Sequence, residues 1–364
     1  MNESRCQFSR RHLLSAGSTA IAAACAGTFG VSDTSAQSPQ MASSRGAPRR
    51  IIKPPRLRPG DTIGLVDPAS ATWEPVDVAV VEESWAALGL KTKRGAHLLE
   101  RRGYFAGSDD ERAADLNAML RDPDVRAVHC VRGGWGSARL LQRLDFTALE
   151  RTPKAVIGFS DITALLLSCT ARTGLVTFHG PNGASQWNPF NVGWLRRVLI
   201  DGEAVTFENI KELGDNLTQV DNRVQTITPG VARGRLLGGN LTVLTAIVGS
   251  SYLPDFNGAI LFVEDVGEEP YRIDRMFTQL DLAGVLKQVR GVVWGTCQEC
   301  DPGVGFGSLT ITDVLSDHVK PLGIPAFQGA MIGHADRQFT LPVGLDVEVD
   351  AKAGTIRMLE PAVS

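Results

Sequence analysis

The sequence predicts an α/β protein with two regions, and three observations support this prediction. Between residues 62 and 178, short apolar runs alternate with segments of helical spacing, which is typical of a mostly parallel sheet with helices on both faces. Later in the chain, a second α/β series gives way to strands that alternate at period two, which indicates an α+β fold. With 364 residues and 43% hydrophobic content, the chain is long enough for two hydrophobic cores.

The first region contains regular strand and helix signals. One predicted helix presents Val78, Val81 and Trp85 on a single face. Another begins at Ser108, because Glu111 stands three residues later and the pair forms a capping box. Apolar strands are expected at 62–67, 125–131, 155–159 and 175–178, and further helices at 137–143 and 162–173.

The second region follows a segment with no clear period. Residues 185–230 are rich in Trp, Asn, Gly and Asp, and we interpret them as a connection between an N-terminal domain, 51–184, and a C-terminal domain, 231–364. Within the latter, Gly238-Gly239-Asn240 is interpreted as a helix entry. Strands are expected at 259–263 and 289–294, helices at 270–283 and 309–319, and short strands between 325 and 359.

The first 36 residues have the layout of a twin-arginine export signal. Arg10-Arg11 precedes a weakly apolar stretch, and Thr34-Ser35-Ala36 fits a cleavage site. That stretch is too weak to anchor the chain, so we expect a periplasmic protein without stable membrane insertion, and residues 37–50 as a linker. Cys25 offers an alternative lipoprotein site, although the aliphatic residue usual three positions earlier is missing.

Charge and cysteine content narrow the choice of partners and cofactors. The formal net charge of −3 provides no attraction to nucleic acid or to an anionic membrane. Cys130 and Cys169 lie in apolar strand and helix patterns, as buried thiols do. Cys297 and Cys300 either form a tight disulfide in an oxidising compartment or supply half of a zinc site. The sequence has no second Cys/His pair at zinc-finger spacing to complete such a site.

Ser160 is the candidate nucleophile. It stands where the apolar strand 155–159 runs directly into an apolar helix, a turn that exposes a serine Oγ at the carboxyl edge of a sheet. The next backbone N–H, that of Asp161, is then aimed at an oxyanion formed beside it. Ile162 replaces the second glycine of the usual Gly-x-Ser-x-Gly pattern, and the alternative is that Ser160 only caps the helix.

A serine nucleophile needs a base and a group that orients this base. His334 follows a glycine in a polar loop, where an imidazole can be exposed and aimed. His179 ends a strand near Ser160 and is a candidate for lining the substrate site, whereas the other histidines have structural or surface positions. Glu264 ends a buried strand, at the edge where open α/β sheets build their sites, although an acidic loop that caps the next helix is the alternative.

Six segments together resemble, in order, the LD-carboxypeptidase family of serine peptidases, which also contains microcin-immunity proteins. The resemblance runs from about Pro59 to Leu359. The segments are Arg132-Gly133-Gly134-Trp135-Gly136, Gly158-Phe159-Ser160-Asp161-Ile162-Thr163, His179-Gly180-Pro181, Gly238-Gly239-Asn240-Leu241, Glu264-Asp265-Val266-Gly267-Glu268, and Gly333-His334 followed by Arg337 and Leu341-Pro342-Val343-Gly344.

The resemblance implies a Ser-His-Glu triad, with Ser160 as nucleophile, His334 as general base and then general acid, and Glu264 as the orienting carboxylate. It also implies a Rossmann-like N-terminal domain, a β-rich C-terminal domain, a homodimer, and no metal or cofactor. The family's best-known reaction releases terminal D-alanine from murein tetrapeptides, by hydrolysis of the bond after an L-configured centre.

The resemblance also implies the surroundings of the triad. Backbone amides of Asp161 and of the Gly133-Gly134 turn would form the oxyanion hole. Two residues depart from the family pattern, because Trp135 stands where tyrosine is common and Asn182 where methionine is common. With His179, these two are the predicted substrate-binding residues.

Two other functions remain open at this point. One is an amidase of the microcin-immunity type that acts on peptide-nucleotide or acyl-amino-acid conjugates. The other is a non-catalytic periplasmic protein that binds peptides in a cleft between two domains without cutting them.

Overall fold

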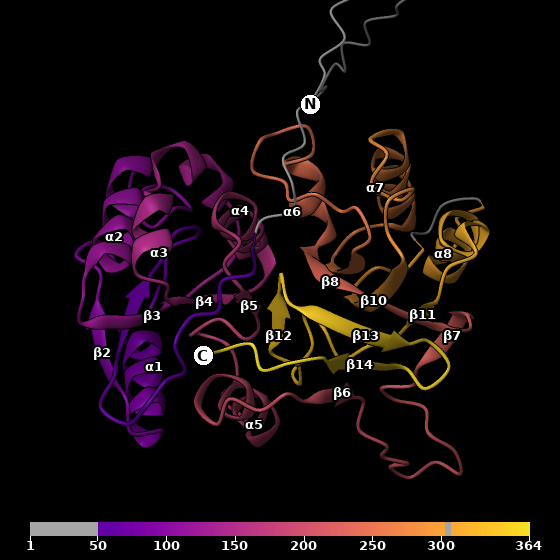
Figure 1. Ribbon diagram of the computed structural model, residues 1–364, viewed down its shortest axis with the longest axis horizontal. Coiled ribbons are helices and arrows are strands. Elements are labelled where there is room, and N and C mark those ends of the chain that lie inside the picture. The colour runs from indigo at the N-terminus through magenta and orange to yellow at the C-terminus, as the bar shows by residue number, and fades with distance from the viewer. Residues whose placement is uncertain (1–49, 303–306) are drawn as a thin grey trace, which may run out of the picture. The chain divides into compact units, whose positions relative to one another are not determined.

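The computed structural model describes residues 50–302 and 307–364, which contain two sheets (Figure 1). The first has six strands in the order β12-β5-β4-β3-β1-β2. All of its neighbouring strands are parallel except β12 and β5. Its strands are β1 (Thr62–Val66), β2 (Lys91–Arg94), β3 (Val125–Cys130), β4 (Ala155–Gly158), β5 (Thr177–His179) and β12 (Leu341–Val343).

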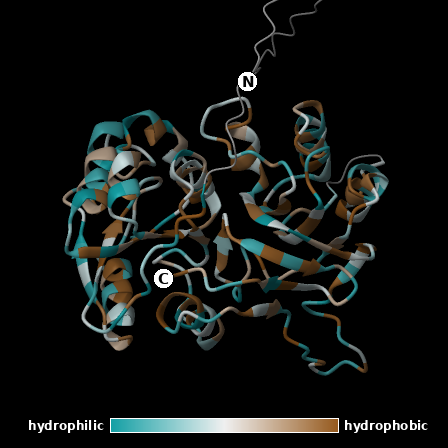
Figure 2. Cartoon of the chain, viewed as in Figure 1, coloured by the Kyte–Doolittle hydropathy of each residue, from teal (hydrophilic) through white to brown (hydrophobic). Residues whose placement is uncertain are grey.

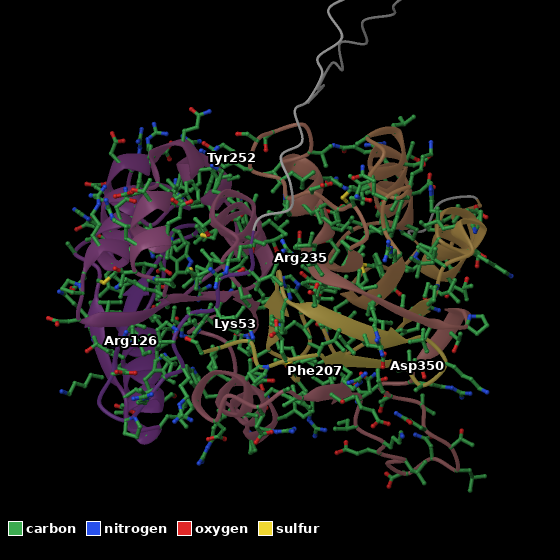
Figure 3. All side chains as sticks on the ribbon, viewed as in Figure 1. Lys53, Arg126, Phe207, Arg235, Tyr252 and Asp350 are labelled. Carbon is green, nitrogen blue, oxygen red and sulfur yellow. A yellow bond between two sulfur atoms is a disulfide. The ribbon has the colours of Figure 1, made fainter. Side chains whose placement is uncertain are left out.

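Helices connect these strands and bury the apolar faces predicted for them. All four residues of β4 are buried, as expected for a parallel strand covered on both faces. Figure 2 shows hydrophilic residues gathered on α2 and α3. The helical elements are α1 (Pro75–Ala87), α2 (Asp109–Arg121), α3 (Phe146–Arg151), α4 (Thr163–Thr173), α5 (Pro189–Leu195), the 3-10 helices η1 (Ser137–Arg143) and η2 (Ser160–Ile162), and the π-helix η3 (Arg196–Ile200).

The second sheet has eight strands in the order β6-β14-β13-β8-β9-β10-β11-β7. Its centre, β8 to β11, is parallel, and its outer strands are antiparallel. The strands are β6 (Thr206–Glu208), β7 (Gln225–Thr228), β8 (Val231–Asn240), β9 (Ile260–Val266), β10 (Gly291–Gln298), β11 (Ala326–Gln328), β13 (Asp346–Asp350) and β14 (Thr355–Met358). Helices α6 (Leu241–Ala246), α7 (Pro270–Leu282), α8 (Ile311–His318) and the 3-10 helix η4 (Lys320–Leu322) connect them.

The segment around β12 joins the two sheets by backbone hydrogen bonds. In the first sheet, Leu341 pairs with His179 in antiparallel register. Three residues after Leu341, the Gly344 N–H donates to the Leu236 carbonyl of β8 at 2.8 Å, and the Leu236 N–H donates to the Leu345 carbonyl at 2.8 Å. The loop that precedes this segment is therefore held against both sheets. It carries His334.

Several elements differ from the sequence-based expectations. The segment 185–230, expected to lack regular structure, contains α5, η3, β6 and β7, which are too short to show a period. The Gly238-Gly239-Asn240 run ends the ten-residue strand β8, and only Asn240 belongs to the helix entry, as the N-cap that accepts from the Val243 N–H at 3.1 Å. Strand β2, with sequence KTKR, was not expected because it is a polar edge strand.

The predicted signal at 1–36 and most of the linker at 37–50 lie outside the described residues. Within the described part of the chain, no helix combines the length and hydropathy needed to cross a membrane.

The capping box at the start of α2 gives a prediction about stability. The Ser108 Oγ accepts from the Glu111 N–H at 3.2 Å, and the Ser108 N–H donates to Glu111 Oε2 at 2.7 Å. Because Ser108→Ala leaves a helix N–H without this partner, we expect it to lower the free energy of unfolding by about 1 kcal/mol, measured by urea denaturation. Ser84→Ala in α1 is the control and should change it by less than about 0.5 kcal/mol. Equal effects of both substitutions would contradict the prediction.

Candidate active site

Ser160 occupies a strained turn between β4 and the helices that follow it. Its φ angle is +62°, a left-handed conformation that non-glycine residues adopt mainly where the surroundings enforce it. The Asn182 side chain fixes the preceding residue, since Oδ1 accepts from the Phe159 N–H at 3.0 Å and Nδ2 donates to the Phe159 carbonyl at 3.4 Å. Ile162, at the position where glycine is usual, is fully buried in the core. The geometry is that of a nucleophile elbow without its second glycine.

His334 and Glu264 complete a chain of hydrogen bonds with Ser160. The His334 Nε2 atom lies 3.0 Å from Ser160 Oγ, and Nδ1 lies 2.8 Å from Glu264 Oε2. Glu264, in β9, is fully buried. The Nδ1–H therefore donates to the carboxylate, which leaves Nε2 free to accept the serine proton.

Gly333 makes this approach sterically feasible. Its φ angle is +103°, a region that favours glycine. A Cβ atom at this position would lie 2.7 Å from both Cβ and Cγ of Glu264. A larger residue before His334 would therefore displace the carboxylate or the loop.

The buried carboxylate also sets the proton affinity of the imidazole. Burial alone would lower the pKa of His334, but the hydrogen bond that its ring donates to Glu264 and the negative charge of this carboxylate outweigh burial and raise the pKa above its ordinary value of 6.5. Asp265, the next residue in β9, bonds instead to Asn240 Nδ2 at 3.0 Å and to the Thr242 N–H at 2.9 Å. Burial, followed by the charge of Glu264, raises the pKa of Asp265 to about 6.

Backbone donors lie beside the hydroxyl of Ser160. A Cβ atom at Gly133 would be 3.3 Å from Ser160 Oγ, so this turn passes very close to the hydroxyl. Within the described residues, the N–H groups of Gly133, Gly134 and Asp161 donate no hydrogen bond. The Asp161 carboxylate accepts from the Ser137 N–H at 2.7 Å, and Ser137 Oγ donates to the Asp161 carbonyl at 2.6 Å, which ties the elbow to the end of the glycine turn.

A cavity of about 440 Å³ opens at Ser160 and His334. Three partly exposed aromatic side chains contribute to its wall, and the rings of Tyr104 and Trp135 lie 5.7 Å apart. The lining residues are Ser70, Trp73, Tyr104, Val131, Arg132, Gly133, Gly134, Trp135, Phe159, Ser160, Asn182, Ala184, Ser185 and His334. A larger cavity of about 740 Å³ is lined by residues 50–53, Thr173, Glu360 and Ser364, so it lies away from this chemistry.

The predicted substrate-binding residues differ in their positions. Trp135 and Asn182 line the cavity, as expected. His179 does not, because it is fully buried and its ring packs edge-on against the rings of Phe159 and Phe262. Burial lowers the pKa of His179 to about 4, so this histidine is a neutral core residue rather than part of the cavity wall.

The sequence analysis missed Ser70, Trp73 and Tyr104. Ser70 and Trp73 follow the carboxyl end of β1, the same edge of the sheet that carries Ser160. Their place after this strand end could have identified Ser70 and Trp73 as cavity residues, since open α/β sheets bind ligands at the carboxyl ends of their strands. Tyr104 lies in an irregular segment before α2 and gives no such signal.

The cysteine alternatives are also resolved. Cys297 and Cys300 form a disulfide, and Cys130 and Cys169 are buried free thiols. Among the described residues, no three His, Cys, Asp or Glu side chains are grouped as metal ligands would be.

Comparison with known protein families shows the family of the chain. The chain matches the LD-carboxypeptidase N-terminal domain over residues 63–180 and the LD-carboxypeptidase C-terminal domain over residues 233–349. The chain belongs to the LD-carboxypeptidase family. It is 36% identical over 317 residues to a probable murein peptide carboxypeptidase of Bacillus subtilis (strain 168), covering 86% of this chain and 95% of that protein.

Other similar proteins include a microcin self-immunity protein and a second carboxypeptidase. The microcin C7 self-immunity protein MccF of Escherichia coli is 27% identical, over 85% of this chain and 96% of that protein. A solved structure of MccF in complex with adenosine monophosphate has a TM-score of 0.78 at 26% identity, covering 86% of this chain and 100% of that one. The muramoyltetrapeptide carboxypeptidase of Oxalobacter formigenes has a TM-score of 0.69 at 29% identity, covering 82% and 97%.

The Glu264–His334 contact predicts a measurable titration. In proton NMR, the His334 signal should titrate with a midpoint above 6.5, and Glu264→Gln should lower this midpoint, because it removes the negative charge that favours the imidazolium. Buried His179 is the internal reference, since its pKa of about 4 keeps it neutral across the same pH range. A His334 midpoint that Glu264→Gln leaves unchanged would contradict the proposed origin of the shift.

Proposed function

We propose that this member of the LD-carboxypeptidase family is a serine carboxypeptidase that releases terminal D-alanine from murein tetrapeptides. The observation that carries the proposal is the hydrogen-bonded series from Ser160 through His334 to buried Glu264. In it, a hydroxyl, an imidazole and a carboxylate have the mutual contacts that nucleophilic catalysis needs. The similarity to the murein peptide carboxypeptidase of Bacillus subtilis, named as probable, and to the muramoyltetrapeptide carboxypeptidase of Oxalobacter formigenes supports murein peptides as the substrate class.

The first half of the reaction forms an acyl-enzyme. Ser160 Oγ attacks the carbonyl carbon of the scissile amide while its proton passes to His334 Nε2. Glu264 stabilises the imidazolium that results, and the N–H groups of Asp161 and of the Gly133-Gly134 turn stabilise the oxyanion. His334 then donates the proton to the amine of D-alanine as the C–N bond breaks.

The second half reverses the roles. His334 accepts a proton from a water molecule, whose oxygen attacks the acyl carbon. The bond to Ser160 Oγ then breaks, the serine recovers its proton from His334, and the shortened peptide leaves. Neutral His334 is needed at the start of both halves, so kcat/KM falls as the pH drops through the raised pKa of this histidine.

A second candidate is an amidase of the microcin-immunity type. It is favoured by the likeness to MccF, whose structure was solved with adenosine monophosphate, and by exposed aromatic side chains at the cavity that offer flat surfaces for a base. The two candidates share their chemistry and differ in the substrate. Turnover of a murein tetrapeptide and of a peptidyl adenylate analogue by the same preparation separates them, because each candidate requires a preference for its own substrate.

We also propose that the enzyme works in the periplasm, exported through the twin-arginine signal, and that it forms a homodimer. The Arg10-Arg11 signal pattern and the Cys297–Cys300 disulfide support the oxidising location. The amino-terminal sequence of protein recovered from the periplasmic fraction tests export, and sedimentation equilibrium tests the dimer. An unprocessed cytoplasmic protein or a monomer would contradict the respective part.

The triad predicts the kinetics of three substitutions. Ser160→Ala and His334→Ala should each lower kcat for D-alanine release by about 10⁴-fold or more, and Glu264→Ala by a smaller factor, because the carboxylate acts through the imidazole. The double substitution of Ser160 and His334 should cost little more than either single one, since the residues act as one unit. Steady-state assay of released D-alanine measures all four variants.

Two controls accompany these measurements. Ser84→Ala, in α1, lies outside the cavity lining and should retain full activity. A fluorophosphonate probe should label the unmodified enzyme and not the Ser160→Ala variant. Peptide binding without turnover or labelling would instead favour a non-catalytic peptide-binding protein.

A further inference from the structure

The cavity contains one side chain with a permanent charge, and the proposed mechanism does not use it. Arg132 follows β3 at the carboxyl edge of the first sheet and lines the same cavity as Ser160 and His334. Among the lining residues in the described part of the chain, none is acidic and no other is permanently cationic. The cavity therefore suits a ligand with a negative charge.

The guanidinium of Arg132 has unused hydrogen-bonding capacity. Its Nε atom is buried and has no hydrogen-bond partner within the described residues. Its side-chain partner is Asp77, at 3.4 Å from Nη2 to Oδ2, with 36% of the Arg132 side chain and 34% of the Asp77 side chain exposed. This long, partly solvated contact stabilises the guanidinium much less than the two parallel hydrogen bonds that arginine can form to a carboxylate.

A second acid faces Arg132 from β1 without neutralising it fully. Asp67 is buried, and its carboxylate accepts from the hydroxyl of Thr72 at 2.5 Å and from the Thr72 N–H at 3.2 Å. Burial raises the pKa of Asp67 to about 7, despite these bonds and the charge of Arg132. The hydrogen bonds of this carboxylate go to Thr72 and not to the guanidinium of Arg132, so Asp67 compensates that charge only in part.

Arg132 is adjacent in the chain to the turn that touches the nucleophile, and its side chain lines the same cavity. Its neighbour Gly133 lies against Ser160, with 3.0 Å between the Cβ position of residue 133 and Ser160 Cβ. In a substrate cleaved before its last residue, the terminal carboxylate is one residue away from the attacked carbonyl, a span of about 3.8 Å between successive Cα atoms. Because Arg132 lines the same cavity as Ser160 and His334, its guanidinium is available to a carboxylate next to the scissile bond.

We propose that Arg132 binds the terminal carboxylate of the substrate and thereby restricts hydrolysis to the last peptide bond. The proposal rests on the proposed function and names the group that makes the enzyme an exopeptidase. A substrate whose last residue is an amide, or is extended, leaves the guanidinium without its anionic partner. Discrimination of this kind is strong because the site then loses charge-assisted hydrogen bonds.

The test compares two substrates that share one scissile bond. Murein tetrapeptide with a free terminal D-alanine and the same peptide ending in D-alaninamide are assayed with the unmodified enzyme and with Arg132→Gln, Arg132→Lys and Arg139→Gln. We expect the unmodified enzyme to prefer the free acid by about 10- to 100-fold in kcat/KM. Arg132→Gln should abolish this preference by slowing the acid substrate alone, and Arg132→Lys should retain part of it, because it keeps the charge without the planar fork.

Arg139→Gln is the matched control. Arg139 is exposed, pairs with Asp109 and lies outside the cavity lining, so its substitution should leave the preference unchanged. A second measurement needs no variant: D-alanine should inhibit the unmodified enzyme more strongly than D-alaninamide does.

Three results would overturn the inference. An Arg132→Gln enzyme that keeps its preference, or that slows on both substrates by the same factor, would show that Arg132 supports the fold and does not bind the carboxylate. If the unmodified enzyme cleaves the peptides ending in D-alanine and in D-alaninamide equally fast, the inference about Arg132 is wrong, although the proposed hydrolase activity is supported. If neither peptide is cleaved and the fluorophosphonate leaves Ser160 unlabelled, the proposed function itself fails.

Discussion

The hydrogen bond between Glu264 and His334 is the interaction on which the candidate site depends. Glu264 is fully buried, and its Oε1 atom has no hydrogen-bond partner among the described residues, so the imidazole at Oε2 is the contact that compensates this carboxylate. A buried acid is unfavourable without such a partner. The same bond fixes the tautomer and orientation of the ring, and it requires the glycine at 333 because a side chain there would meet Glu264.

The main features of the fold could be predicted from local patterns. Buried strand β4 and the first four residues of β9 are continuous apolar runs, and helices such as α2 begin with a capping box, so both are visible in the sequence. Short or polar strands at the edge of a sheet give no such signal in the sequence. Strand β2 is polar, and β6 and β7 are only three and four residues long, which is too short for a period to appear.

The residues of the candidate site could be predicted only in part from the sequence. Ser160 follows β4 and Glu264 lies near the carboxyl end of β9, the ends at which open α/β sheets build their sites, so their types and places carry a signal. Their contact with His334 carries no signal of this kind, since 174 residues separate Ser160 from His334 and no local pattern encodes that contact. Only the resemblance to the family linked them. The same strand-end reasoning misplaced His179, because a strand end does not reveal whether a side chain turns into the core or into the cavity.

The backbone bonds of residues 341–345 have a consequence for how substrate reaches the enzyme. This short stretch pairs with β5 on one side and bonds to Leu236 of β8 on the other, so the sheets cannot swing apart without breaking main-chain ladders. Nucleophile and base are consequently preassembled before any peptide arrives. Because Ser160 and His334 already lie 3.0 Å apart in this arrangement, binding energy need not be consumed in bringing them together.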